Sequence, residues 1–552
     1  MAKLRYARIQ ATNDVSHLSS VRSKGRGTPL ATNEIRTRCQ IRRRRSSLRI
    51  ISSVNETATA TDPLKEEAGK AVPAGVVLGR SSFPLGFAFG TATSAYQVEG
   101  AWNEGGKGPS IWDTFNHQQK GKIKDGSNGD VATDAYHKYK KDIKLMKQMG
   151  VDSYRFSVSW SRILPDGTVK GGVNEQGIKY YNNLIDKLIE NGITPFVTIF
   201  HWDVPQALED KYGGFRNRKI VDDFKDYARV CFQEFGDRVK HWITLNEPWS
   251  FCTLGYSVGI NAPGRGSKTL GCSVGNSLTE PYIVAHNMIL AHGAAAALYR
   301  HNFKAVQRGE IGITQITTWF IPYSNSHEDK AAAQRSIDFM LGWFMDPLVN
   351  GDYPFIMRLI VGDRLPSFTK KESEMIKGSY DFMGLNYYTS AYARALPTPN
   401  TFKPSNTIEE SYATQLNEKD GKPIGKLEGS SIYVVPIGIK DLLVYTKKRY
   451  KNPKIYITEN GTAQLDNGTL TIKQARADED RIDYISLHLA QIRTAIQEEV
   501  NVKGYFTWSL TDNFEWYEGY SERFGLIYID YAKGLKRYPK ASFKWYRRFL
   551  MS

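Results

Sequence analysis

The chain has 552 residues, and its 74 Lys and Arg outnumber its 57 Asp and Glu, which gives a net charge of +17. The excess is uneven: residues 1–50 hold 13 Lys and Arg and two acidic residues, a net +11, which leaves +6 for the rest. So small an excess of positive charge on residues 51–552 excludes the basic surface of a typical nucleic-acid-binding domain. The sequence contains no apolar run of about 18 residues, so no membrane span is predicted.

The first 50 residues are rich in Arg, Ser and Thr, poor in acidic residues, and lack the apolar core of a secretory signal. This composition is typical of an organelle transit peptide. Two alternatives stay open: the run Arg42 to Arg45 as a nuclear address or a polyanion-binding patch, and a simple disordered basic leader. Residues 51–80 are predicted to be a Ser/Thr/Ala/Gly linker, and residues 81–552 to form one domain.

Eight strand-like stretches alternate with helical patterns after residue 81. Strands are predicted at 87–90, 153–159, 195–201, 241–246, 311–315, 382–387, 455–458 and 504–510. Apolar residues at helical spacing predict helices at 133–149, 175–190, 220–235, 282–299, 330–349, 437–450 and 479–498. Strands that alternate with helices in this way predict an α/β fold, a single (β/α)8 TIM barrel with long loops over its active-site face. The stretch 397–430 has no clear period and is predicted to be one of these loops.

Two glutamates end apolar runs that lie 212 positions apart, Glu247 in Ile-Thr-Leu-Asn-Glu-Pro and Glu459 in Tyr-Ile-Thr-Glu-Asn-Gly. A barrel presents catalytic side chains at the C-terminal ends of its strands, so a closed fold would bring both to one substrate. Cleavage of an acetal requires one carboxyl that keeps its proton to release the leaving oxygen. It also requires an ionised carboxylate that attacks or stabilises the sugar cation. The pair therefore indicates glycoside cleavage.

Seven motifs in order carry a resemblance to a known family. They are Thr-Ala-Thr-Ser-Ala-Tyr-Gln-Val-Glu-Gly at 91–100, Tyr-Arg-Phe-Ser-Val-Ser-Trp at 154–160, Phe-His-Trp-Asp at 200–203, Asn-Glu-Pro at 246–248, Asn-Tyr-Tyr at 386–388, Thr-Glu-Asn-Gly at 458–461 and Trp-Ser-Leu-Thr-Asp-Asn-Phe-Glu-Trp at 508–516. From about Phe83 to the C-terminus the chain resembles the plant β-glucosidases of glycoside hydrolase family 1. Within that family it resembles a monocot plastid group that acts on benzoxazinoid, cyanogenic or steroidal-saponin glucosides.

The resemblance implies a retaining O-β-glucosidase of plant defence. It implies a small-molecule β-glucoside as the partner, no cofactor or metal, no nucleic acid or membrane, and a plastid as the destination of the leader. Relatives often form dimers or larger assemblies, so a homo-oligomer is expected by analogy. Relatives that hydrolyse thioglucosides carry Gln where Glu247 stands, and the glutamate here therefore implies an O-glycosidase.

The resemblance also implies a role for each matching residue. Glu459 would be the nucleophile and Glu247 the acid/base. Arg155 and Tyr388 would keep the nucleophile ionised, although an ordinary buried polar pair is the alternative for these two. Asn386 and Phe524 match supporting positions.

Eight residues match the positions that bind glucose in the family. Hydrogen-bonding groups read the hydroxyls, and indole faces cover the apolar side of a pyranose. A carboxylate near the 4- and 6-hydroxyls would repel a 6-phosphate. Taken singly, each Trp would more often belong to the core and the histidine would more often be structural. The eight residues are Gln97, His201, Trp202, Asn246, Tyr388, Trp508, Glu515 and Trp516.

The predicted aglycone side departs from the benzoxazinoid glucosidases. Those enzymes carry Trp at the position of Ser431 and Phe at the positions of Leu254 and Asn261, whereas Phe251 and Tyr517 remain here as apolar contacts. Fewer aromatic walls predict a wider slot that holds a flat ring poorly. The stretch 250–256 is similar to monocot enzymes that act on steroidal saponins, so a bulky furostanol-type aglycone is expected, with benzoxazinoid or cyanogenic glucosides as the alternative.

Other functions stay open beside hydrolysis. A transglucosidase would use the same residues, with an acceptor alcohol in place of water. A non-catalytic glycoside-binding member of the fold would be expected to have lost one of the two glutamates, and both are present. Nucleic-acid binding would require basic and aromatic residues interleaved on the folded body, and this pattern is not found.

The four cysteines, Cys39, Cys231, Cys252 and Cys272, are too few and too scattered for a disulfide scaffold or a metal cluster. Relatives tie a loop with a disulfide that follows Ala-Pro-Gly-Arg, whereas Gly266 stands here at the position of its first cysteine. Cys272 is therefore expected to be unpaired or to pair with Cys252.

Overall fold

The structure is a computed structural model that describes residues 78–119, 121–397 and 401–552. The predicted leader 1–50, and the predicted linker 51–80 up to residue 77, lie outside the described residues. The transit-peptide interpretation therefore stays a prediction.

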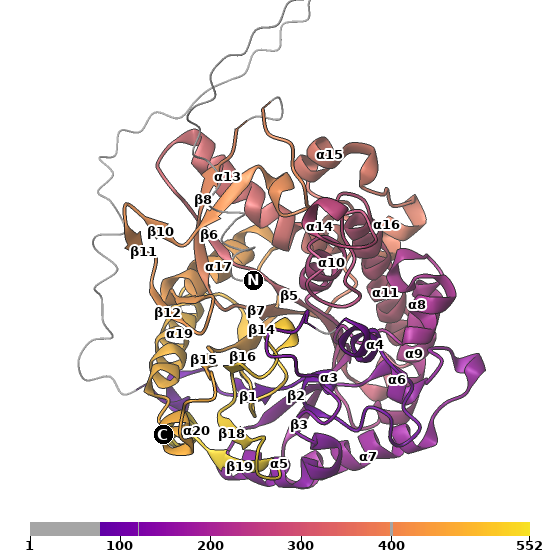
Figure 1. Ribbon diagram of the computed structural model, residues 1–552, viewed down its shortest axis with the longest axis vertical. Coiled ribbons are helices and arrows are strands. Elements are labelled where there is room, and N and C mark those ends of the chain that lie inside the picture. Colours follow the sequence, from indigo (N-terminus) through magenta and orange to yellow (C-terminus); the bar gives the residue numbers. More distant parts are fainter. Residues whose placement is uncertain (1–77, 120, 398–400) are drawn as a thin grey trace, which may run out of the picture. The chain divides into compact units, whose positions relative to one another are not determined.

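The described residues fold around a closed barrel of eight parallel strands (Figure 1). Around the barrel the order is β1, β2, β3, β4, β5, β7, β14 and β16, and β16 pairs again with β1. This confirms the predicted (β/α)8 fold. The strands are β1 Ala88–Ala92, β2 Ser153–Ser157, β3 Thr194–Phe200, β4 His241–Asn246, β5 Glu310–Ile316, β7 Phe382–Asn386, β14 Ile455–Asn460 and β16 Val502–Trp508.

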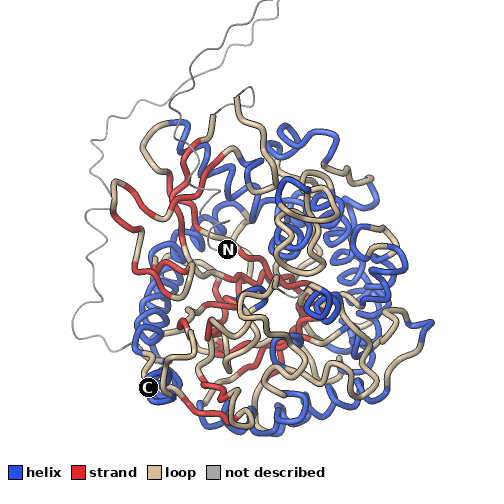
Figure 2. Tube along the Cα trace, in the orientation of Figure 1, coloured by secondary structure: helices blue, strands red, loops and turns tan. Residues whose placement is uncertain are grey.

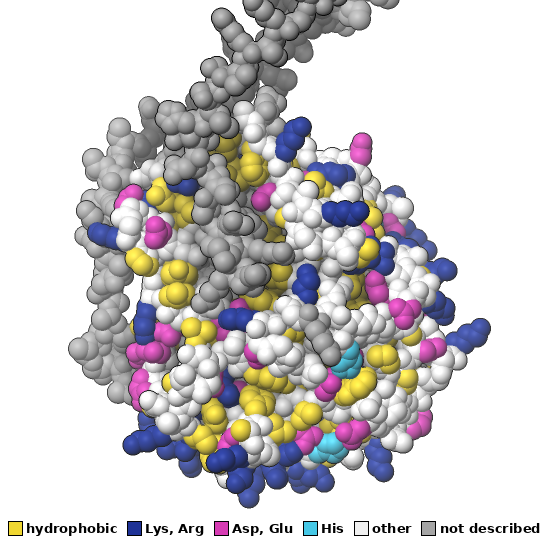
Figure 3. All heavy atoms as spheres, in the orientation of Figure 1, with side chains coloured by type: hydrophobic (Ala, Val, Ile, Leu, Met, Phe, Trp, Pro, Cys, Tyr) yellow, Lys and Arg dark blue, Asp and Glu magenta, His cyan; other side chains and the backbone are white. Residues whose placement is uncertain are grey.

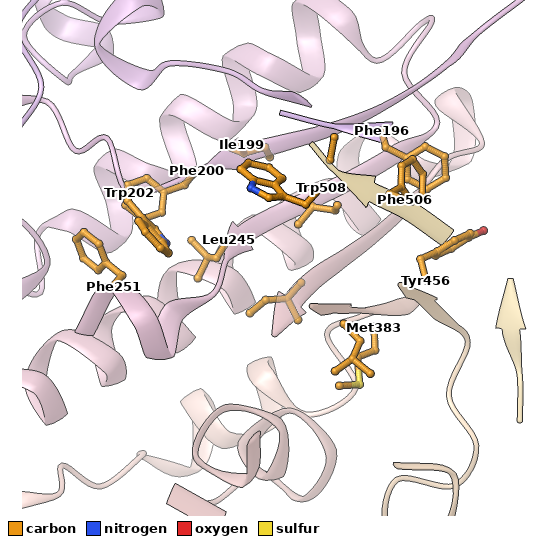
Figure 4. Packing of buried hydrophobic residues seen from close by; sticks show 14 of the residues in the cluster. Phe196, Ile199, Phe200, Trp202, Leu245, Phe251, Met383, Tyr456, Phe506 and Trp508 are labelled. Atoms are coloured by element: carbon orange, nitrogen blue, oxygen red, sulfur yellow. The ribbon is translucent and has the colours of Figure 1, made fainter. Parts of the chain in front are cut away.

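Aromatic rings fill the N-terminal end of the barrel interior. The ring of Phe196 on β3 lies 5.2 Å from that of Tyr456 on β14 and 4.8 Å from that of Phe506 on β16. Because β3 and β14 are not neighbours in the sheet, these rings can meet only inside the barrel. His241 stacks on Phe196 at 4.0 Å, and Phe382 lies 5.1 Å from Tyr456. Figure 4 shows Phe196, Tyr456 and Phe506 together at one end, with Trp202 and Trp508 toward the other.

Helices surround the strands, as Figure 2 shows. The helix α7 illustrates why: Asn174 caps its first turn, and one face, with Ile178, Leu184 and Leu188, is buried. The helices that follow successive barrel strands are α5 Ala135–Met149, α7 Glu175–Glu190, α9 Ile220–Phe235, α11 Glu280–Asn302, α13 His327–Ile337 with α14 Trp343–Asn350, α17 Pro436–Arg449, α19 Glu479–Gln497 and α20 Ala541–Met551.

Between the strands, the predicted helix 330–349 is helical throughout but not one regular α-helix, and the predicted loop 397–430 is wrong in part. The predicted helix 330–349 is two α-helices, α13 and α14, joined by the π-helical segment Asp338–Gly342. The predicted loop 397–430 contains short strands: β9 Ala413–Leu416 joins β6 Trp319–Pro322 and β8 Ser390–Ala395 in one sheet. Two small hairpins follow, β10 Glu418–Lys419 with β11 Lys422–Pro423, and β12 Lys426–Glu428 with β13 Ile432–Val434.

The cysteine question is settled for Cys252 and Cys272, both in the described part of the chain. The Cys252 thiol donates to Met288 Sδ at 3.6 Å, and the Cys272 thiol to the Val258 carbonyl at 3.6 Å. No disulfide joins these two described residues.

The visible face carries both signs of charge. Figure 3 shows acidic and basic side chains interspersed over it, with Lys and Arg more frequent along the lower edge. Among the described helices, none combines the length and the apolar character that a bilayer crossing requires. Among the described residues, no His, Cys, Asp and Glu group of three or more is arranged to hold a metal ion.

Candidate active site

The two glutamates lie at the C-terminal ends of β4 and β14. Glu247 directly follows β4 and is the N-cap residue of α10 Pro248–Tyr256, with a left-handed φ of 43°. Glu459 lies within β14, so the prediction that this strand ends at residue 458 is wrong. Both strands shift register beside a glutamate, between Ile243 and Asn246 and between Ile457 and Glu459. Such irregularities re-aim side chains at the rim of a barrel.

Glu459 contacts a cation and a hydroxyl donor. The buried guanidinium of Arg155, at β2, donates to Glu459 Oε1 and forms an ion pair with it. The Tyr388 hydroxyl donates to Glu459 Oε2 at 2.7 Å. Phe524 packs against this tyrosine, with the two ring centres 6.1 Å apart and the ring planes nearly perpendicular. A cation and a hydroxyl donor both favour the ionised carboxylate that a nucleophile needs.

Glu247 lies in an environment that favours its protonated form. Burial raises the pKa of Glu247 to about 8, and the charge of Glu459 adds to this shift. Asn386 Nδ2 donates to Glu247 Oε1 at 2.6 Å, and Ser250 Oγ donates to Oε2 at 2.8 Å. These donors offset part of the shift without reversing it. At neutral pH the group therefore keeps its proton, as a general acid requires.

Hydrogen bonds connect the two carboxyl groups. Arg155 donates to Asn246 Oδ1 at 2.6 Å as well as to Glu459, and Asn386 donates to Asn246 Oδ1 at 3.3 Å as well as to Glu247. The Thr458 hydroxyl orients Asn386 through its Oδ1 at 2.7 Å. Arg155 is thus part of the site rather than of an isolated polar pair with Tyr388.

The predicted sugar-binding residues at and beyond the C-terminal ends of β3 and β16 gather beside this network. His201 Nε2 lies 3.0 Å from Asn246 Nδ2, and Trp202 Nε1 donates to the Asn246 carbonyl at 2.9 Å. The indoles of Trp202 and Trp516 lie 4.5 Å apart, and His201 lies roughly parallel to Trp508 at 6.1 Å. All four aromatic side chains are buried within the described structure. Their faces supply the flat apolar surfaces that pyranose binding requires.

Glu515 forms a second polar group with Gln97. Asn513 Nδ2 and Gln97 Nε2 donate to Glu515 Oε2 at 2.8 and 3.2 Å. Burial raises the pKa of Glu515 to about 8, and Glu522 and Glu459 contribute. The sequence argument treats Glu515 as a carboxylate that repels a 6-phosphate; the raised pKa favours the neutral acid in the free protein at pH 7. The negative charge of a 6-phosphate would still make sugar binding less favourable, because it would repel Glu515 whenever this carboxyl is ionised.

The predicted aglycone residues lie in two groups. Leu254 is half-buried on α10, and its carbonyl accepts the backbone N–H of the buried Asn261 at 3.1 Å. Ser431 is exposed at the turn between β12 and β13, and the neighbouring Ser430 hydroxyl donates at 3.4 Å to Glu518, the residue after Tyr517.

Phe251, a predicted aglycone contact, packs among other aromatic rings. It is buried on α10, with ring centres 5.3 Å from Phe200, 5.8 Å from Phe215 and 5.5 Å from Tyr256. Four rings packed edge to face form part of the core. Phe251 therefore packs in the core beside the site, and its contact with an aglycone stays a prediction.

Besides Thr458, two further residues contact the site and were not predicted. Ser250 holds Glu247, and Asn513 holds Glu515. Spacing could have indicated Ser250, because residues three apart at a helix start share a face. Asn513 lies in an irregular segment, where spacing gives no comparable signal.

Comparisons with known proteins assign this arrangement to a family. A family model, described as glycosyl hydrolase family 1, matches residues 79–552. The furostanol glycoside 26-O-beta-glucosidase of Hellenia speciosa is 63% identical over 480 residues, which cover 87% of this chain and 85% of that protein. The raucaffricine-O-beta-D-glucosidase of Rauvolfia serpentina is 53% identical over 493 residues, which cover 85% of this chain and 91% of that protein.

Solved structures agree. A mutant rice β-glucosidase in a covalent complex with Glc is 52% identical, with a TM-score of 0.84 and coverage of 86% of this chain and 100% of that chain. A family 1 β-glucosidase of Humicola insolens in complex with glucose is 44% identical, with a TM-score of 0.82 and coverage of 86% and 98%. The chain therefore belongs to glycosyl hydrolase family 1 and is a β-glucosidase of that family.

Proposed function

We propose that the enzyme cleaves O-β-glucosides with retention, by double displacement between Glu459 and Glu247. The observation that carries the proposal is the opposed environments of the two carboxyls. Glu459 faces a guanidinium and a phenol, whereas Glu247 is buried with a pKa raised to about 8. One environment favours an ionised carboxylate and the other a protonated carboxyl, which is what the nucleophile and the acid/base of this chemistry require. The rice relative, solved in a covalent complex with Glc, supports the same route.

The first step breaks the bond between the anomeric carbon and the glycosidic oxygen. Glu459 attacks that carbon and Glu247 gives its proton to the leaving oxygen, so the aglycone departs as an alcohol. In the second step Glu247, now a carboxylate, takes a proton from water. The water oxygen attacks the anomeric carbon, the bond to Glu459 breaks, and Glu247 is protonated again.

The stereochemistry tests this assignment. Because two inversions give net retention, proton NMR of the earliest products is expected to show β-glucose, with α-glucose growing only by mutarotation. The matched roles imply carboxyl groups about 5 to 5.5 Å apart. If α-glucose appeared first, a single displacement would operate and Glu459 would not be the nucleophile.

The pH dependence of kcat/KM is expected to report the raised pKa of Glu247. Activity requires the protonated acid, so kcat/KM should fall as pH rises through about 8, where the free enzyme loses this proton. Glu515 has a similar raised pKa and is the competing source. The Glu515→Gln variant, although less active, is expected to keep the alkaline limb. Loss of the limb in that variant would assign it to Glu515 instead.

For the aglycone, we propose a bulky alicyclic skeleton of the furostanol type. The relative named as a furostanol glycoside 26-O-beta-glucosidase is 63% identical to this chain. Ser431 is an exposed small residue at the tip of the β12–β13 hairpin, and Leu254 and Asn261 lie side by side through a backbone hydrogen bond. None of the three is aromatic, so these positions supply no ring that would clamp a flat aglycone.

Restoring a ring tests the proposed slot. Ser431→Trp is expected to lower kcat/KM for a furostanol 26-O-glucoside about tenfold or more relative to 4-nitrophenyl glucoside, since overpacking costs about 1–3 kcal/mol. The matched control is Leu427→Trp, which adds the ring at an exposed position of the same hairpin. A wild-type enzyme that prefers benzoxazinoid or cyanogenic glucosides to every steroidal glucoside offered would overturn the aglycone proposal and leave the β-glucosidase assignment intact.

A further inference from the structure

The π-helical segment Asp338–Gly342 interrupts the helix that follows β5. All five of its residues are buried. An inserted residue widens the turn, so the carbonyls there do not line up with the usual N–H partners. Such insertions are rare and often lie at functional sites. A buried carbonyl that has turned out of the ladder needs another donor.

Two residues at the catalytic end of the barrel, one on α10 and one in the loop after β5, contact this segment. Trp249 Nε1 donates to the Phe339 carbonyl at 3.1 Å. The Thr318 backbone N–H, just beyond β5, lies 3.4 Å from Met340 Sδ. The wide turn therefore presents an acceptor to the first turn of α10 as well as a sulfur to the end of β5.

Trp249 stands two residues after Glu247. Glu247 adopts a left-handed backbone, which is unfavourable for a non-glycine residue and persists only where neighbours hold it. Its N–H donates to the Thr314 carbonyl at 2.9 Å, and its carbonyl accepts the Phe251 N–H at 3.2 Å. The hydrogen bond from the Trp249 indole to the Phe339 carbonyl also links this turn to the π-helical segment.

The far side of the π segment is anchored by charge. Arg449 on α17 pairs with Asp338 at 2.6 Å and with Asp346 on α14 at 2.6 Å. Tyr450 also donates to Asp346 at 2.9 Å, and Gln334 to Asp338 at 3.1 Å. The Phe339 carbonyl is therefore presented from a fixed support.

We propose that Trp249 is a positioning residue for the acid/base, and that its hydrogen bond to the Phe339 carbonyl of the π segment fixes the left-handed turn that aims Glu247. The proposal rests on the assignment of Glu247 as the acid. Trp249 acts through the backbone of α10, so its contribution is to proton delivery and not to nucleophilic attack by Glu459.

The test is Trp249→Phe, which keeps an aromatic ring and removes the N–H donor. The substrates are substituted phenyl glucosides of similar size, so that aglycone contacts stay alike while the acidity of the leaving phenol varies. We expect kcat/KM to fall about tenfold for phenyl glucoside and less than twofold for 2,4-dinitrophenyl glucoside. The second substrate depends less on the acid because its leaving group departs as the phenolate, without a proton. The alkaline limb of the pH profile is expected to move to lower pH, because a looser turn admits water to Glu247.

The matched control is Trp343→Phe, close by on α14. Trp343 is 1% exposed, and its Nε1 has no hydrogen-bond partner among the described residues. The same chemical change there removes packing and no hydrogen bond, so any loss should be equal across the series. Trp249→Tyr, which also lacks the N–H, is expected to repeat the Trp249→Phe pattern and serves if that variant does not fold.

An equal loss across leaving groups, or unchanged kinetics with phenyl glucoside, would overturn the role of Trp249. The parallel measurement on Glu247→Gln separates this failure from that of the proposed function. If Glu247→Gln depends on the leaving group and Trp249→Phe does not, only the positioning role is lost. If neither does, the assignment of the acid itself is wrong.

Discussion

Changing Glu459 to Gly is expected to reduce kcat for aryl glucosides by a factor of about 10⁴ to 10⁶, the loss seen when a catalytic nucleophile is removed. Neither Arg155 nor Tyr388, the two groups that hold Glu459, can replace a nucleophile, since one is a cation and the other a neutral phenol donor. Added azide is expected to restore part of the rate, because a small anion can occupy the place of the carboxylate beside Arg155. The rate is measured against azide concentration with 2,4-dinitrophenyl glucoside.

The configuration of the azide product identifies the side of attack. Azide that replaces Glu459 attacks the anomeric carbon from the face opposite the leaving group, so the product should be the α-glucosyl azide. The control is Glu459→Gln, which fills the same space with a neutral amide and should respond less to azide. A β-glucosyl azide from Glu459→Gly would mean that the nucleophile is another residue.

Changing Glu247 to Gln is expected to have a large effect that depends on the leaving group. For alkyl glucosides, which need a proton on the departing oxygen, kcat/KM should fall about 10²- to 10⁴-fold. For 2,4-dinitrophenyl glucoside kcat/KM should change little, because the phenolate departs unaided. The amide can still meet Ser250 and Asn386, so the fold of the site should survive. The alkaline limb of the pH profile should disappear with the titrating group.

The control for Glu247→Gln is Ser250→Ala, which removes the hydroxyl donated to Glu247 Oε2 and keeps the acid. That donor lowers the pKa of Glu247, so its loss should move the alkaline limb to higher pH while activity on all leaving groups persists. An equal loss in Glu247→Gln for alkyl and dinitrophenyl glucosides would contradict the acid role.

The barrel was predictable because its signal is repeated. Each strand is an apolar run such as Thr194–Phe200, and each helix a periodic one, so an error of one or two residues at a boundary does not change the fold. The π segment was not predictable, since one inserted residue leaves the apolar spacing of 330–349 almost unchanged. The hairpins between 418 and 434 include strands of two residues, too short for alternation to appear.

The site divides in the same way. The motifs located Glu247, Glu459 and most of the residues that hydrogen-bond to them. These motifs lie at the C-terminal ends of strands, where a barrel carries its catalytic residues. The register shift beside Glu459 and the left-handed backbone of Glu247 arise from pairing across strands, which a single stretch of sequence does not contain. The packing of Phe251 against three neighbouring rings is another such feature, because residue type alone does not indicate which rings meet in the fold.

Phe196, Tyr456 and Phe506 pack together at the N-terminal end of the barrel interior. This packing determines the route by which substrate enters and products leave. Because side chains fill that end, substrate and products cannot pass through the barrel. They must enter and leave at its C-terminal end, between the loops. In the proposed mechanism the aglycone leaves first, water then follows the same path inward, and glucose departs last. Glucose still in place blocks the next substrate, so accumulating product should compete with substrate and slow the enzyme.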